Sequence, residues 1–104
     1  METFGVIEIE KGLHPFDSYN EPLYCVGFNR EDECEPLCDE DMAFGANLSL
    51  KDYIEKIGEI VDGDPTQTLT YNYTTDYGHD LTDTYFKYKG DADKFVEYLN
   101  SLVV

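Results

Sequence analysis

The sequence has no tryptophan and few basic residues, with seven lysines and arginines against 23 aspartates and glutamates in 104 residues. Its formal net charge is −16, and a chain so acidic is repelled by nucleic acid and by anionic membranes. It also lacks an apolar run near the ~20 residues of a membrane span, and a basic segment followed by an apolar run at its start. We therefore expect a cytoplasmic protein that binds neither nucleic acid directly nor a membrane.

Catalytic motifs are absent as well. The sequence has no nucleophile and base pair in a known spacing, no glycine-rich phosphate loop, no HExxH helix and no EF-hand pattern. The two histidines, His14 and His79, each fall in an expected loop beside proline or aspartate, where an exposed residue is the simpler interpretation. The sequence therefore favours a binding protein over an enzyme, and it indicates no cofactor.

What the sequence does have is enough apolar surface for a folded core. Apolar residues make up 41% of the chain and aromatic residues 14%, which is too much for a disordered protein despite the charge. A length of 104 residues suits one domain, 1–104, that needs no metal or disulfide to fold.

Hydrophobic periodicity predicts six elements in the order β-β-α-β-β-α. The four expected strands cover residues 3–11, 22–29, 66–75 and 81–89. Ser49 is the expected cap of a first amphipathic helix that ends at Gly63, and Asp91 is the expected cap of a second. We expect an α+β fold in which a four-stranded, mostly antiparallel sheet carries both amphipathic helices on one face.

The strand at 66–75 alternates cleanly and so defines two faces. Leu69, Tyr71 and Tyr73 fall on one face, and Thr68, Thr70, Asn72 and Thr74 fall on the other. Because the helices need an apolar sheet surface, the tyrosine face is expected to lie against them, with Val6 or Ile7 and Val26 completing it.

The segment 29–41, NREDECEPLCDED, is the most unusual part of the chain. It holds seven carboxylates, which are Glu31, Asp32, Glu33, Glu35, Asp39, Glu40 and Asp41. The acids follow neither a helical nor a strand period, and Pro36 interrupts any helix. We expect an exposed loop, which is a metal site, a solvated segment without a task, or an anionic surface for a basic partner.

The metal interpretation depends on Cys34 and Cys38, which could supply two zinc ligands, with His14, His79 or Cys25 completing a tetrahedral set. Two observations oppose it. The paired spacing of the usual zinc signatures is missing, and the neighbouring carboxylates should raise the thiol pKa and so disfavour the thiolate. An odd count of three cysteines also fits reduced thiols better than disulfides.

The charge itself is the most informative feature, because crowded acids destabilise a folded chain by self-repulsion. An array of carboxylates can occupy the Lys- and Arg-lined channel in which a partner binds DNA phosphate. In size, composition and lack of catalytic motifs, though by no motif of its own, the chain resembles the small acidic phage-encoded inhibitors that block restriction or CRISPR machinery by imitating DNA. That resemblance implies a partner that is a basic protein, such as a nuclease or CRISPR effector, in the cytoplasm of a host cell.

We therefore expect a protein–protein inhibitor whose partner-binding residues are the seven carboxylates of segment 29–41. The alternatives are an immunity protein against a nuclease toxin, a cysteine-based metal-binding module, and an acidic surface that is only solvated, as in a salt-adapted protein.

Overall fold

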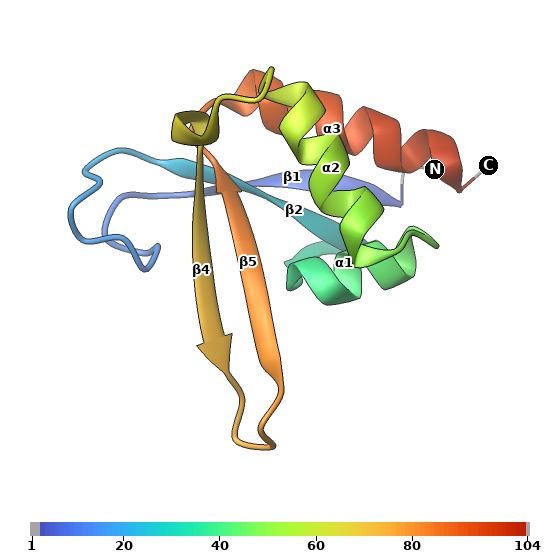
Figure 1. The fold of residues 1–104 in the computed structure, drawn as a ribbon, viewed down its shortest axis with the longest axis horizontal. Helices are drawn as coiled ribbons and strands as arrows, with labels where there is room; N and C mark the ends of the chain where they lie inside the picture. Colours follow the sequence, from blue (N-terminus) through green and yellow to red (C-terminus); the bar gives the residue numbers. More distant parts are fainter. Residues whose placement is uncertain (1–2, 104) are drawn as a thin grey trace.

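The computed structural model describes residues 3–103 and has an α+β fold with an antiparallel sheet (Figure 1). The expected class is confirmed, but the expected layout is wrong in its details, since the structure has five strands, three α-helices and a short 3-10 helix. They are β1 (Phe4–Ile9), β2 (Leu23–Arg30), β3 (Glu33–Pro36), α1 (Asp39–Gly45), α2 (Leu50–Ile60), η1 (Pro65–Gln67), β4 (Thr68–Thr74), β5 (Asp80–Phe86) and α3 (Lys89–Leu102).

Strand β2 is the centre of the sheet, and two different strands share one of its edges. Its first edge pairs with β1 from Phe4 opposite Phe28 to Ile9 opposite Leu23. Its second edge pairs with β3 at the C-terminal end and with β5 at the N-terminal end, where Tyr24 opposite Phe86 is the single residue pair. Beyond that pair the β4–β5 hairpin diverges from β2, as Figure 1 shows. We call this region, where β2 and β5 separate, the seam.

Gly27 on β2 shows how closely the first three strands pack. A Cβ atom built there would lie 2.5 Å from Ile7 Cδ1, 2.6 Å from the Glu35 carbonyl oxygen and 2.9 Å from Cys34 Sγ. Real Cβ atoms do not approach other atoms so closely, and the carbonyl is backbone that cannot rotate away. The residue must therefore be glycine for β1 and β3 to lie against β2 as they do.

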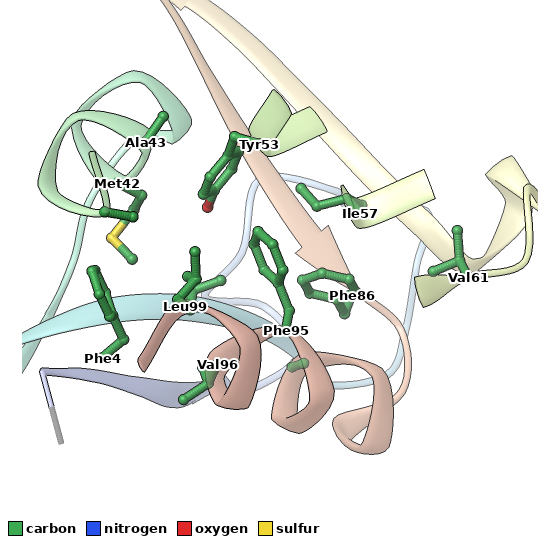
Figure 2. Packing of buried hydrophobic residues seen from close by; sticks show 13 residues of the cluster. Phe4, Met42, Ala43, Tyr53, Ile57, Val61, Phe86, Phe95, Val96 and Leu99 are labelled. Atoms are coloured by element: carbon green, nitrogen blue, oxygen red, sulfur yellow. The ribbon is translucent and has the colours of Figure 1, made fainter. Parts of the chain in front are cut away.

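The main core lies between one face of the sheet and the three helices. Phe95 of α3 is at its centre, with its ring centroid 4.9 Å from that of Tyr53 and 5.8 Å from that of Phe86. Met42 of α1 and Phe4 of β1 close one end of the same cluster (Figure 2). Such continuous burial of large side chains provides most of the hydrophobic free energy of folding.

The start of α2 agrees with the sequence prediction, and the start of α3 does not. The Ser49 hydroxyl oxygen accepts a hydrogen bond from the Asp52 N–H at 3.1 Å, so the predicted cap of α2 is confirmed. The helix ends at Ile60, three residues before the predicted Gly63. The predicted cap of α3 is wrong, because α3 begins at Lys89 after Tyr88 and Asp91 is already its third residue.

The two faces of β4 lie opposite to the predicted arrangement. The threonine face is turned toward α2, since Thr68 and Thr70 line a groove of about 300 Å³ together with Ile57 and Val61. The tyrosine face is turned away from the helices. Threonine methyl groups therefore supply apolar contacts that the alternation had assigned to tyrosine.

The segment 10–22 covers the tyrosine face and gives the sheet a second, smaller packed side. The Phe16 ring packs edge-on against Tyr71 and Tyr85, with centroids 6.2 and 5.6 Å apart. His14, expected to be exposed, is only 5% exposed: its Nδ1 accepts from the Phe16 N–H at 3.2 Å, and its Nε2 donates to the Glu21 carbonyl at 2.9 Å. This histidine fixes the shape of the covering segment.

Asn100 of α3 joins the helix to β1, because its Oδ1 accepts from the Thr3 and Phe4 N–H groups at 2.9 Å and its Nδ2 donates to the Phe4 carbonyl at 3.1 Å. Within residues 3–103, no helix is both long enough and apolar enough to cross a bilayer.

Candidate functional site

The acidic segment 29–41 is a regular structure, so the prediction of an exposed loop is wrong. Arg30 and Glu33 face each other across a two-residue turn, and the chain then continues as β3 and pairs with β2. After Pro36 it enters α1 at Asp39. The seven predicted site residues therefore belong to two different elements, a hairpin and a helix.

The hairpin tip presents four of the seven carboxylates to solvent. Glu31, Asp32 and Glu33 are exposed and Glu35 is half-buried, and with Arg30 these four line a shallow hollow at the tip. Arg30 Nη1 lies 3.8 Å from Glu35 Oε2, and both side chains are largely solvated, so this ion pair adds little stability. Glu31 has a φ of 56°, a left-handed conformation that is unusual for a residue with a side chain. The tip thus holds three exposed acids beside one arginine.

Asp39 does not belong to the exposed surface, contrary to the prediction. It is 3% exposed, and its carboxylate accepts two hydrogen bonds from Thr84 of β5, one from the N–H at 3.1 Å and one from the hydroxyl at 2.5 Å. Burial raises the pKa of Asp39 to about 7, although the two bonds from Thr84 act in the opposite direction. Asp39 joins α1 to β5 across the seam.

Glu40 makes a second hydrogen bond from α1 to β5, and the structure shows no bond to β5 for Asp41. Glu40 is half-buried and its Oε1 accepts from the Thr82 N–H at 2.9 Å, whereas Asp41 is exposed. The N–H groups of Thr82 and Thr84 face the edge of β5 from which β2 has diverged. Two carboxylates of α1 therefore occupy the hydrogen-bonding positions that a neighbouring strand would take.

The seam also encloses a cavity of about 200 Å³ that the sequence did not predict. Polar groups that line it include Tyr73, Asp83, Tyr85, Cys25, Cys38 and Asp39. The Tyr73 hydroxyl donates to Asp83 Oδ1 at 3.4 Å, and burial raises the pKa of both groups, to about 12 for the tyrosine. The sequence predicted a strand over 81–89, without assigning Asp83 and Tyr85 to a face. Nothing in the sequence indicated that α1 lies over them.

The geometry does not support a metal centre. Among residues 3–103, no three His, Cys, Asp or Glu side chains lie in an arrangement that could hold a metal ion. Burial raises the pKa of Cys25 to about 12 and of Cys38 to about 11, and it also raises that of Cys34, so all three favour the neutral thiol. Cys34 instead packs against Gly5 and Gly27 on the outer face of the sheet.

The net charge is distributed unevenly between the two long helices and the rest of the chain. Helices α2 and α3 hold four lysines and six acids, so they contribute −2. The remaining residues hold three basic groups and 17 acids, which gives −14 of the total −16. The negative charge is therefore concentrated in the strands, the hairpins, α1 and the loops.

Comparison with known proteins gives no relative: no family model, no curated protein and no solved structure matches this chain.

Proposed function

We propose that the protein is an inhibitor that binds a basic, nucleic-acid-handling protein, such as a restriction nuclease, a CRISPR effector or a nuclease toxin, in place of DNA. The observation that carries the proposal is the hairpin tip, where Glu31, Asp32 and Glu33 are exposed together. Carboxylates gathered at one turn can occupy the positions that DNA phosphates take in the Lys- and Arg-lined channel of a partner.

The charge distribution supports the same proposal. Fourteen of the sixteen net negative charges lie outside α2 and α3, so the strands, hairpins, loops and α1 carry most of the charge that a cationic partner would sense. An acidic surface attracts a basic partner and speeds association by roughly 10- to 1000-fold.

The proposed contact differs from the one expected from the sequence. It consists of Glu31, Asp32, Glu33 and Glu35 on the hairpin, together with the exposed Asp41 of α1. Asp39 and Glu40 serve the fold instead, because their carboxylates are bound to β5.

The test measures cleavage of duplex DNA by a panel of restriction nucleases, RNA-guided nucleases and nuclease toxins in the presence of the protein. We expect at least one member to be inhibited, with inhibition relieved by excess duplex DNA and by added salt, because exposed charge pairs are screened beyond ~8 Å at physiological ionic strength. A panel in which no member is inhibited, or inhibition that excess DNA leaves unchanged, would contradict the proposal.

A pair of charge reversals locates the contact. Asp32→Lys with Glu33→Lys, both on exposed positions, should weaken inhibition by ~10-fold or more. The matched control is Glu55→Lys with Glu59→Lys on the exposed side of α2, which changes the net charge equally. If both pairs weaken inhibition to the same extent, the partner senses only net charge and the hairpin is not the contact.

A further inference from the structure

Strand β4 is at the edge of the sheet, and its hydrogen-bonding groups on the outer side are unpaired with any strand that the structure describes. Within the ladder, Leu69, Tyr71 and Tyr73 lie opposite Tyr85, Asp83 and Leu81 of β5. The bonds from Thr75 N–H to His79 O at 2.9 Å and from Lys87 N–H to Gln67 O at 3.0 Å show that odd-numbered residues of β4 bond to β5. The N–H and C=O groups of the even-numbered residues, from Thr68 to Thr74, therefore point outward.

This edge carries no formal charge. From Pro65 to Thr75 there is no Asp, Glu, Lys or Arg, in a chain of which 29% is charged. Natural proteins usually protect an edge strand with lysine, proline or a bulge, since an open edge pairs readily with another strand. Pro65 precedes the strand, and β4 itself has none of these features.

The side chains along the edge are suited to cross-strand pairing on both faces. Tyr71 and Tyr73 are stacked with ring centroids 5.7 Å apart, and Tyr71 remains 40% exposed. Thr70, Asn72 and Thr74 are exposed on the opposite face. Aromatic and threonine side chains both form favourable cross-strand pairs.

We propose that a second copy of this chain adds to the sheet through β4, antiparallel and with Tyr71 opposite Tyr71. In this register Leu69 lies opposite Tyr73, Thr70 opposite Asn72, and Thr68 opposite Thr74. Even-numbered residues face even-numbered residues, which is what outward hydrogen bonds require. The two sheets become one, with the two copies of β4 at its centre.

The occupant follows from the charge on the edge. A cationic partner gains nothing from a strand without carboxylates, whereas a copy of β4 brings the same uncharged strand and a self-complementary order of side chains. The nearest acids in sequence, Asp64 and Asp76, lie beyond opposite ends of the strand, and Asp80 and Asp83 of β5 lie opposite Thr74 and Tyr71, so the dimer brings carboxylates of both copies toward its axis. Dimerisation is therefore opposed by like charge, and added salt strengthens it.

The sign of this salt effect separates the dimer from the proposed inhibition, which salt weakens. Sedimentation of the full chain at several protein concentrations should show a monomer–dimer equilibrium whose dissociation constant falls as sodium chloride is raised. Asn72→Lys, which puts a charge on an exposed position of the edge outside the groove against α2, should leave the protein monomeric without changing its effect on the nuclease panel. The Asp32→Lys and Glu33→Lys variant should still dimerise. A protein that is monomeric at every salt and protein concentration, or a dimer that Asn72→Lys leaves intact, overturns the proposal.

Two cysteine variants test the register. Directly opposite residues in a pair without hydrogen bonds have Cα atoms ~4.5 Å apart, which a disulfide can span. With oxidised glutathione as the two-electron acceptor, Tyr71→Cys should give a covalent dimer in high yield. The matched variant Tyr73→Cys, which faces Leu69 in the proposed register, should not. Equal crosslinking of both variants, or of neither while the protein is dimeric, would contradict this register.

Discussion

Asp39 and Thr84, 45 positions apart in the chain, form a buried pair in which both carboxylate oxygens accept hydrogen bonds from the threonine. The pair holds the first turn of α1 against the open edge of β5. It also places a titratable group in the core beside Glu40 and Asp83, whose negative charges further raise its pKa. The stability of the protein should therefore fall as pH rises, with Asp39 as the main contributor and Asp83, whose pKa burial also raises, acting in the same direction.

The first prediction concerns this pH dependence. The pKa of Asp39 is raised from 3.8 to about 7 by burial, so between these values the folded protein binds a proton that the unfolded chain has lost. The free energy of unfolding should therefore fall as pH rises through this window, by at most about 4 kcal/mol, and level off above it. Urea unfolding at a series of pH values measures it.

Asp39→Asn should flatten that dependence, because an amide does not titrate and can still hydrogen-bond to Thr84. The exposed Asp41→Asn is the control and should retain the slope of the parent protein. An Asp39→Asn curve as steep as that of the parent would mean that general repulsion among the acids, and not Asp39, sets the slope.

The second prediction concerns the tight contact of the first three strands. Gly27→Ala should lower the free energy of unfolding by about 1 to 3 kcal/mol, since its Cβ would lie 2.6 Å from the Glu35 carbonyl oxygen. Gly58→Ala in α2 is the matched control. No heavy atom of another part of the chain lies within 4 Å of its Cβ, so it should stabilise the protein by about 0.5 to 1 kcal/mol through helix propensity. If the two variants change the free energy of unfolding equally, β1 and β3 can move apart to accommodate the added methyl group, and the prediction is wrong.

The third prediction concerns the cysteines. Because the thiol pKa values are raised, iodoacetamide should alkylate the cysteines slowly at neutral pH in the folded protein and rapidly in urea. Mass spectrometry measures the extent of alkylation at each cysteine over time. Half-buried Cys34 should react first and buried Cys25 last. A chelator should leave the thermal midpoint unchanged. Rapid modification of native Cys38, or a lower midpoint with chelator, would restore the metal interpretation.

The elements that the sequence predicted correctly depend on local signals. Ser49 caps α2 through a bond to a residue three positions away, and the alternation from Thr68 to Thr74 requires a strand whatever surrounds it. A period of two defines two faces, but it does not say which one meets the helices. That depends on Phe16 and its neighbours folding back over the tyrosines, a contact between segments more than 50 residues apart.

The site was harder to predict for the same reason. Glu33 to Pro36 have low strand propensity and become a strand only because the turn at Glu31 returns the chain to β2. Asp39 looks like its neighbours in sequence, and its burial is decided by Thr84. The exposed acids at the hairpin tip were predicted correctly as exposed, because charged residues near a turn have nothing to pack against.

At the seam, the two parts of the sheet share very little backbone hydrogen bonding. A single backbone pair, Tyr24 opposite Phe86, joins β1–β2–β3 to the β4–β5 hairpin, and the carboxylates of α1 make the remaining polar links. We therefore expect the two parts of the sheet to open separately, each with its own opening free energy. In amide hydrogen exchange, the N–H groups of Thr82 and Thr84 should exchange with the opening of α1, while those of β4 and β5 that bond to each other remain protected.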